Sequence, residues 1–344
     1  MNAKKVLIPI FIGYASVVQG APLDIFLETH IPDNDKRQEL EFAIDHSVTS
    51  NQFKSGDYRG WHIRGSRFLT DQIRIDGGYW KRSLDTGANW TDMTTWQIGT
   101  QWQFLNQDGM RPAFALRYSL WNDKTDLLTK ASFTFQKTKV TDIRVTNVDD
   151  RQHQVNLIAT WQLNHDWESP RWQFALFSGF GKSRIRFADV LAKYKGRDYH
   201  WRSPDEHTVI GEADSGDFLY FEDLEIQAPG PDMDISYDAS YFQAGANLTR
   251  AAESWYLRLG YQFQSLDRDL DTTISEDGKR IYKTNHLFIT EVGYSWSRNW
   301  VTFLNFQYLK NQTVGELPLL YNAYTSNRFE KDYGLMSAGV RFSF

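Results

Sequence analysis

The first chemical question for this chain is whether any of its eight histidines could activate a serine. A serine two residues from a histidine on one strand face would lie beside its base. The residues two positions after the histidines are Pro, Val, Arg, Val, Trp, Arg, Val and Phe, so none has this arrangement. The chain also has no cysteine, which removes thiol nucleophiles and thiolate metal ligands. We expect no enzyme, although a serine site assembled from separate strands stays open.

Two acidic stretches could serve other chemistry. The first combines carboxylates with a histidine, as a protease at the rim of a barrel would require: His207, Asp214, Asp217, Glu222 and Asp223. The second places aspartates at alternate positions, as a calcium loop does: Asp267, Asp269 and Asp271. The glycine and distal glutamate of a calcium loop do not follow in register. We interpret both stretches as solvated loops, and expect no metal site and no cofactor.

Composition and charge exclude two further classes. The formal net charge of −5 and the lack of a basic cluster argue against nucleic-acid binding. After the N-terminus, no segment is apolar for the 18 or so residues that a membrane helix needs. The aromatic content of 15% suits the rings that line the two interfaces of a membrane barrel.

Alternating segments of about ten residues dominate the chain, and this is the length of a tilted membrane-spanning strand. In 96–104, for example, Trp96, Ile98 and Trp102 alternate with glutamines and a glycine. In 154–163 the alternation has one exception, Ile158, which falls on the polar face. The other candidates are 38–46, 58–67, 71–82, 113–120, 129–142, 171–186, 234–249, 255–264, 283–297, 300–308 and 331–344.

These thirteen candidates are one too few or one too many, because a single-chain bacterial barrel needs an even number of strands. We locate the ambiguity in 121–170 or in Phe218 to Gln227. The sequence therefore predicts an all-β fold, a transmembrane antiparallel up-and-down β-barrel of 12–14 strands.

The connections fall into two length classes. Asn106 to Gly109, Arg250 to Glu253 and Ser295 to Asn299 read as tight turns. Three other connections are long: Phe187 to Met233, Leu266 to Lys283 and Lys310 to Glu330. Short turns on one side and long loops on the other are the asymmetry of an outer-membrane barrel.

Charged residues on the predicted strands indicate which face lines the lumen. A charge facing lipid at mid-membrane costs about 2–4 kcal/mol, so these side chains should point inward. The pore-lining candidates are His62, Arg64, Arg74, Arg117, Arg258, Arg341, Glu41 and Glu291. One interpretation is a water-filled pore with a transverse field. The other is a narrow lumen plugged by ion pairs and glutamines, or constricted by an inward loop.

The first twenty residues have the features of a secretory signal peptide. Lys4 and Lys5 precede a short apolar run from Val6 to Val18. Residues of small or modest size, Val18 to Gly20, precede Ala21, as a signal peptidase requires. We expect the domain boundaries 1–20 for the signal peptide and 21–344 for the barrel. Within the latter, Ala21 to Arg37 would be a short N-terminal periplasmic segment.

The last candidate strand, 331–344, alternates most clearly. Val340, Phe342 and Phe344 share one apolar face, while Arg341 and Ser343 lie on the other. We expect this strand to close the barrel by pairing with the first strand near Leu40, Phe42 and Ile44, with Arg341 opposite Glu41 and Glu291.

The chain resembles bacterial outer-membrane β-barrel proteins in its signal peptide, in its alternating strands from about Gln38 onward and in this last strand. The resemblance implies location in the bacterial outer membrane, contact with its lipids and with lipopolysaccharide, and a monomer. It also implies that the barrel-assembly machinery reads Phe344, Phe342 and Val340. The chain's end resembles those of solute-specific porins and of barrels attached to secretion or polysaccharide-export systems.

Our main hypothesis is a channel that passes small hydrophilic solutes by diffusion. Because the inward arginines outnumber the carboxylates assigned, we expect a mild preference for anions or sugars. The alternatives are a partner-dependent barrel that exports or assembles polysaccharide or protein, and, less favoured, a barrel hydrolase acting on lipid or peptide.

Overall fold

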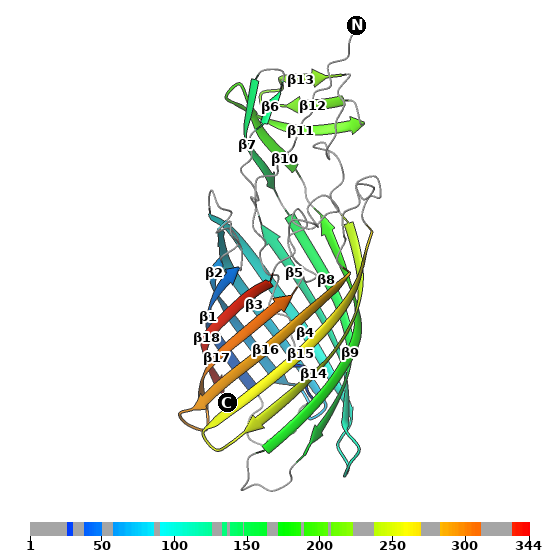
Figure 1. Ribbon diagram of the computed structural model, residues 1–344, viewed down its shortest axis with the longest axis vertical. Coiled ribbons are helices and arrows are strands. Elements are labelled where there is room, and N and C mark those ends of the chain that lie inside the picture. Colours follow the sequence, from blue (N-terminus) through cyan, green and yellow to red (C-terminus); the bar gives the residue numbers. More distant parts are fainter. Residues whose placement is uncertain are drawn as a thin grey trace.

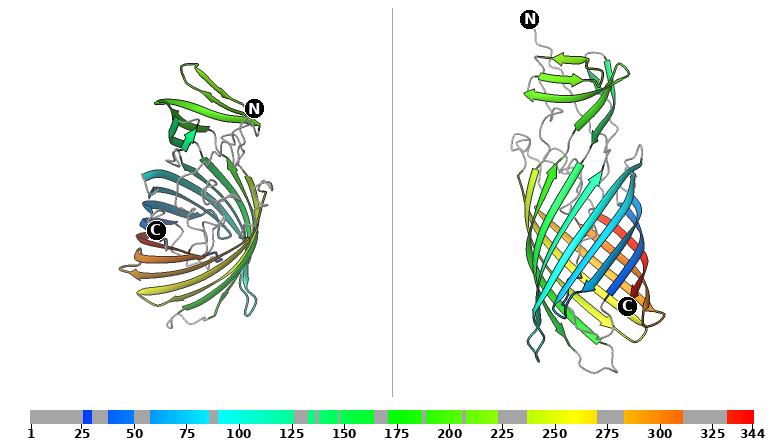
Figure 2. Two further views of the ribbon diagram at one scale, coloured as in Figure 1. Left: turned by 45° about the horizontal axis from the view of Figure 1, so that its top comes forward. Right: turned by 180° about the vertical axis from the view of Figure 1, so that it is seen from behind.

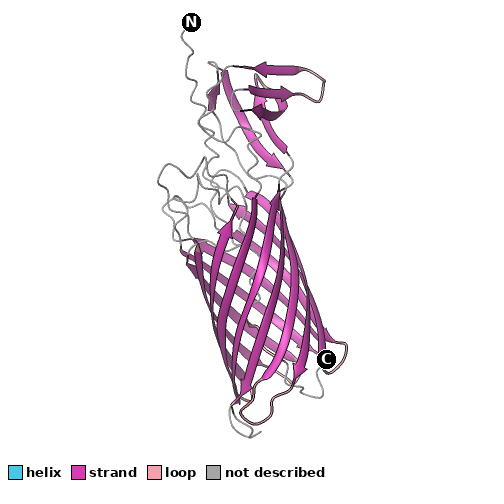
Figure 3. Cartoon of the chain, turned by 90° about the vertical axis from the view of Figure 1, so that its right-hand side faces the viewer, coloured by secondary structure: helices cyan, strands magenta, loops and turns pink. Residues whose placement is uncertain are grey.

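The computed structural model describes thirteen stretches of the chain. They are residues 26–29, 38–49, 58–85, 90–125, 133–135, 138–146, 148–163, 171–186, 189–205, 208–222, 237–269, 283–310 and 332–344. The expected signal peptide, 1–20, lies outside them. Every named element in these stretches is a β-strand (Figure 3). No helix that could cross a membrane is found in the described part of the chain.

Twelve strands close into an antiparallel barrel, within the predicted range of 12–14 (Figures 1 and 2). They are β1 (Gln38–Thr49), β2 (Tyr58–Phe68), β3 (Ile73–Asp85), β4 (Trp90–Leu105), β5 (Ala113–Thr125), β8 (Val148–Gln162), β9 (Arg171–Arg186), β14 (Tyr237–Ala251), β15 (Trp255–Arg268), β16 (Thr284–Ser295), β17 (Trp300–Lys310) and β18 (Asp332–Ser343).

The barrel closes where β1 pairs with β18, as predicted. Leu40 lies opposite Phe342, and Phe42 opposite Val340. The backbone of Gln38 and Phe344 exchanges two hydrogen bonds of 3.0 and 3.1 Å below the last ladder pair. Closure leaves no open edge in the barrel sheet, and an open edge is what lipid does not tolerate.

The two faces of the barrel wall separate side chains by chemistry. In β9, Leu176, Ser178 and Phe180 point outward and are exposed, while Ala175 and Phe177 point inward and are buried. On β1, outward Leu40, Phe42 and Ile44 are 45–63% exposed. Such a continuous apolar exterior is unsuited to water and fits contact with acyl chains.

The short turns lie at the end of the barrel that holds the C-terminus (Figure 1). The three predicted tight turns join β4 to β5, β14 to β15 and β16 to β17. The long connections leave from the opposite end, so the predicted asymmetry is confirmed. By the usual orientation of such barrels, the short-turn end faces the periplasm.

A second sheet, outside the barrel, was not predicted. Its six strands are β13 (Phe218–Phe221), β12 (Thr208–Glu212), β11 (Arg197–Asp205), β10 (Asp189–Tyr194), β7 (Thr138–Thr146) and β6 (Phe133–Phe135), in that spatial order. It lies beyond the long-connection end of the barrel (Figure 1). The candidate spanning strand 129–142 is therefore wrong, because β6 pairs with β7 and β7 pairs with β10, and neither pairs with the barrel. The extra candidate does fall within 121–170, where the ambiguity was located.

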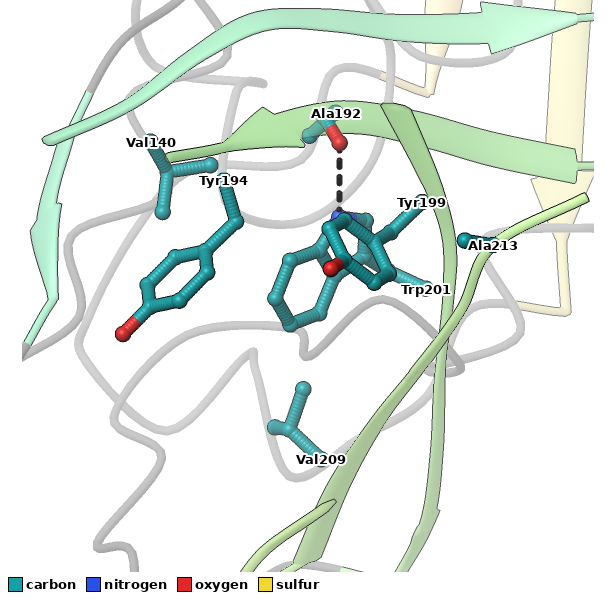
Figure 4. Close-up of a cluster of buried hydrophobic side chains, with 7 residues drawn as sticks. All are labelled: Val140, Ala192, Tyr194, Tyr199, Trp201, Val209 and Ala213. Atoms are coloured by element: carbon teal, nitrogen blue, oxygen red, sulfur yellow. Dashed lines mark hydrogen bonds between the residues drawn. The ribbon is translucent and has the colours of Figure 1, made fainter. Parts of the chain in front are cut away.

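The expectation of a loop over Phe187 to Met233 is also wrong for the part that the structure describes. Strands β7, β10, β11 and β12, with Ala213 just after β12, bury a cluster on one face of the sheet: Val140, Ala192, Tyr194, Tyr199, Trp201, Val209 and Ala213 (Figure 4). The indole nitrogen of Trp201 donates a hydrogen bond to the Ala192 carbonyl (3.1 Å). Lys195 and Gly196, at φ 50° and 82°, form the two-residue turn between β10 and β11. Positive φ at both positions matches the strand twist of a tight hairpin.

Candidate functional site: the barrel lumen

The eight predicted pore-lining side chains lie on the inner face of the barrel. Glu41, His62, Arg117, Glu291 and Arg341 are at most 9% exposed, and Arg64, Arg74 and Arg258 are partly buried. The structure brings six of them into one cluster at the short-turn half of the barrel: Glu41, His62, Arg64, Arg258, Glu291 and Arg341. Arg74 and Arg117 lie apart from this cluster on β3 and β5.

Arg341 on β18 is the centre of the cluster. Its Nη2 lies 2.6 Å from Glu41 Oε2 and 3.4 Å from Glu291 Oε1. Its Nη1 donates to the Tyr256 hydroxyl (2.9 Å), and its guanidinium stacks 4.9 Å from the Phe303 ring centre. Arg341 therefore contacts two buried carboxylates at once. Such a group is costly to bury and holds together only while every partner is present.

His62 on β2 lies between two carboxylates of β1. Its Nδ1 is 2.9 Å from Asp45 Oδ2, and its Nε2 is 3.1 Å from Glu41 Oε1. The Ser337 hydroxyl donates to Asp45 Oδ1 (2.7 Å). The serine is thus bonded to the carboxylate and not to the histidine, so this group does not form a base and nucleophile pair.

Arg117 on β5 forms a two-pronged ion pair with Asp76 on β3. Its Nη1 and Nη2 donate to the two carboxylate oxygens at 2.6 and 2.8 Å. Gly99 on β4 lies between the two strands, and a Cβ there would meet both partners at 2.6–2.7 Å. Asp76 was absent from our predicted set, although the alternation of 71–82 places it on the inner face beside Arg74.

Amide side chains fill the lumen nearer the long-connection end. Gln243 donates to Asn156 (2.7 Å) and accepts from Gln262 (3.0 Å) and Gln264 (3.3 Å). Tyr241 donates to Gln154 (3.0 Å). These amides are at most 3% exposed, so side chains are closely packed at this level of the lumen. Of the two interpretations from sequence, a plugged lumen describes the present conformation.

Segment 26–29 also lies inside the barrel, against the inner face of β4, β5, β8, β9, β14 and β15. These four residues belong to 21–37, the expected periplasmic segment, and they lie in the lumen. Leu27 is 2% exposed and packs with Ala115, Ile158 and Phe177. Ile158, the exception to the alternation of its strand, is thus the inward apolar contact of this segment. An unexplained apolar residue on a polar inner face was the sequence signal for it.

Polar contacts fix the same segment in place. The Glu28 carboxylate accepts from Arg258 (3.1 Å) and from Gln173 (2.9 Å). The backbone oxygens of Leu27 and Glu28 accept from Asn247 and Gln101, each at 3.1 Å, and the Thr29 amide donates to the Thr160 hydroxyl (2.8 Å). Because Arg258 also lies 3.6 Å from Glu291, it joins this segment to the ionic cluster.

Two buried aspartates lie at the long-connection end of the lumen. Asp123 on β5 and Asp150 on β8 are direct partners in the ladder and are 2% and 1% exposed. The Thr95 hydroxyl donates to Asp123, and the Ser183 hydroxyl donates to Asp150 at 2.5 Å. With Asp76, they make the described lumen richer in carboxylates than the sequence predicted.

The two acidic stretches noted in the sequence do not converge on the lumen. Asp214 lies 3.1 Å from His200, and Asp217 lies 2.8 Å from Arg197, both in the second sheet. His207, Asp223 and Asp271 lie outside the described residues. Within those residues, no group of three or more histidine, aspartate or glutamate side chains is arranged to bind a metal.

Comparison with family models gives no match, and neither does comparison with curated protein sequences. Solved structures are similar. The translocator domain of autotransporter NalP from Neisseria meningitidis aligns with a TM-score of 0.51 at 8% identity, over 91% of this chain and 90% of that one. The Pseudomonas putida toluene transporter TodX aligns with a TM-score of 0.41 at 10% identity, over 91% of this chain and 90% of that one. The NanC porin aligns with a TM-score of 0.42 at 10% identity, over 88% of this chain and 100% of that one. The likeness to NalP is one of fold: the chain has the fold of an outer-membrane β-barrel.

Proposed function

We propose that this protein is a channel of the bacterial outer membrane for small hydrophilic solutes, and that its own segment 26–29 closes the lumen at rest. The observation that carries the proposal is the pairing of this segment with the wall. A segment that only filled the lumen permanently would need no more than apolar packing. Here Leu27 enters an apolar contact while Glu28 is held by hydrogen bonds and an ion pair, which water or a polar solute can replace.

The expected anion preference needs revision. It depended on an excess of inward arginines, but Arg117 and Arg341 are each neutralised by carboxylates. Of the other inward arginines, Arg258 lies 3.1 Å from Glu28 and Arg64 lies 3.9 Å from Glu41. Amides, which both donate and accept hydrogen bonds, line the rest of the path. We therefore favour uncharged, hydroxyl-rich solutes such as sugars over anions.

Single-channel recording in planar bilayers tests this function. The mature protein should be closed for most of the record. Replacing residues 26–29 by a Gly-Ser-Gly-Ser stretch should produce long openings, with a reversal potential near zero in a salt gradient. Replacing the turn 106–109 by the same stretch is the matched control and should leave the channel closed. A variant that stays closed, or a strongly cation-selective one, would contradict the proposal.

A partner-dependent export barrel is the second candidate. The filled lumen and the six-stranded sheet beyond it favour this function, since a simple diffusion pore requires neither. NalP, the solved barrel of similar fold, is described as an autotransporter translocator. Recovery of a periplasmic partner with the tagged protein, together with a channel that stays closed after the 26–29 replacement, would favour export over diffusion.

Two other expectations stay proposals. The barrel-assembly machinery would read Phe344, Phe342 and Val340, of which Val340 and Phe344 are exposed on the outer face. A hydrolase is the least favoured candidate, because Ser337 is bonded to Asp45 and not to His62. A lipid or peptide turnover assay with the purified barrel tests it.

A further inference from the structure

Cations gather on the outer face of β8 and β9, at the long-connection end of the barrel. Arg151, Lys182, Arg184 and Arg186 all point outward and are exposed. The ladder places Arg151 directly opposite Arg184, and His153 directly opposite Lys182. Like charges facing one another across two strands destabilise a sheet unless an anion lies between them.

The neighbouring carboxylates pair with only one edge of this patch. Asp238 lies 3.8 Å from Arg184 and 2.8 Å from Arg186, and Asp149 lies 3.6 Å from Lys124 on β5. Neither Arg151 nor Lys182 has a carboxylate partner among the described residues. The two side chains nearest the centre of the patch are therefore the ones left without a counter-charge.

The patch begins where the apolar exterior ends. On β9 the outward residues run from Leu176 through Phe180 to Lys182 and Arg184, and on β8 from Leu157 through Val155 to His153 and Arg151. Successive outward residues are about 7 Å apart along a strand. A lipid whose acyl chains cover Phe180 and Val155 would thus bring its headgroup to the level of the cations.

We propose that Arg151, Lys182 and Arg184 bind the phosphate groups of an acylated, phosphorylated lipid of the outer leaflet, of the lipid A kind. Paired guanidinium groups match the geometry of phosphate oxygens, and basic side chains at headgroup depth attract anionic lipids. The long-connection end faces the outer leaflet in the orientation assigned from the turns. The connections from β5 to β8 and from β9 to β14 contain the strands of the six-stranded sheet, so the lipid would be held just below this sheet.

Binding of lipid A carrying two phosphates to the delipidated full-length protein, measured by native mass spectrometry in detergent, tests this site. The triple variant Arg151→Gln, Lys182→Gln, Arg184→Gln should bind about a hundredfold more weakly. The matched control changes three outward, exposed cations at the same end of other strands, Arg59, Lys81 and Lys310, to glutamine. It should bind within about twofold of the unaltered protein.

Two further binding measurements identify the class of ligand. Lipid A without its phosphates should lose the difference between the triple variant and the control. Inorganic phosphate, read by its ability to displace the lipid, should compete poorly because it lacks the acyl contact. Equal binding by both variants, or equally strong binding of inorganic phosphate, would overturn the proposal. Neither result depends on conductance, so a failure here is separate from a failure of the channel proposal.

Discussion

At the scale of single residues, Arg341 matters most because it contacts Glu41, Glu291, Tyr256 and Phe303 at once. Removing one partner of a buried ionic group leaves the others charged and unpaired, at a cost of about 3–5 kcal/mol. Arg341→Gln should therefore lower the free energy of unfolding of the barrel by about this amount, measured by denaturant titration in lipid vesicles. The double variant Arg341→Gln, Glu41→Gln should recover part of the loss.

A second substitution at this position separates the effect of the charge from that of the side-chain shape. Arg341→Lys keeps the charge but not the planar fork that reaches Glu41, Glu291 and Tyr256 together. If it were as stable as the unaltered protein, the charge alone would account for the cluster. If Arg341→Gln were also neutral, Arg341 would hold no part of the barrel's stability, and the view of the cluster as an ionic clamp would be wrong.

Residue-scale prediction from sequence reaches the face of a strand but not the partners across the lumen. The alternation identifies Glu41 and Arg341 as inward, and because their strands are neighbours, the pairing follows. Arg117 and Asp76 are separated by the whole of β4, and Gly99, which lets them meet, is an ordinary strand residue in the sequence. The partner missed from sequence is therefore Asp76, which meets Arg117 only because Gly99 leaves room between them.

At the scale of elements, the six-stranded sheet is a folded unit with its own core. Trp201 is 8% exposed and contacts Tyr194 and Phe221 at ring-centre distances of 6.2 Å. Trp201→Ala should lower the free energy of unfolding of this sheet by about 3–5 kcal/mol. We expect proteases added outside intact cells to cut the variant between residues 189 and 222. The gel shift of the barrel, which is the difference in migration between heated and unheated samples, should be unchanged.

Phe218→Ala is the matched control, because Phe218 is an aromatic residue of the same sheet but 60% exposed. It should remain as resistant to protease as the unaltered protein. Cleavage of both variants to the same extent would show that the aromatic cluster does not stabilise the sheet. Loss of the barrel's own gel shift in Trp201→Ala would show that the two sheets fold as one unit.

Element-scale prediction was accurate where strands span the membrane and failed outside it. Lipid enforces a strict inside-outside alternation over about ten residues, so twelve barrel strands are visible from their pattern alone. In the second sheet the strands are only three to nine residues long, which leaves little room for a clear alternation. The Lys195-Gly196 turn after Tyr194 was a local hairpin signal, but nothing in the sequence assigns its strands to a separate sheet.

At the scale of the whole molecule, a barrel with a filled lumen has to rearrange before anything passes, and the least costly rearrangement is withdrawal of segment 26–29. Moving a wall strand would break ladder hydrogen bonds on both sides, whereas this segment is joined to the wall by a few side-chain contacts. The chain has no cysteine, so an engineered pair would be the only one. Leu27 and Ala115 belong to one buried cluster, so a bridge between them would join the segment to the wall.

We expect the variant Leu27→Cys, Ala115→Cys to be closed when oxidised and to open when a reductant is added, because reduction leaves Leu27 truncated and its apolar contact weakened. Conductance across one planar bilayer, recorded before and after the reductant, measures the change. The single variant Leu27→Cys should open to the same degree in both conditions. Identical conductance of the oxidised and reduced double variant, with the disulfide verified by mass, would place the passage elsewhere in the lumen and not along the path that this segment occupies.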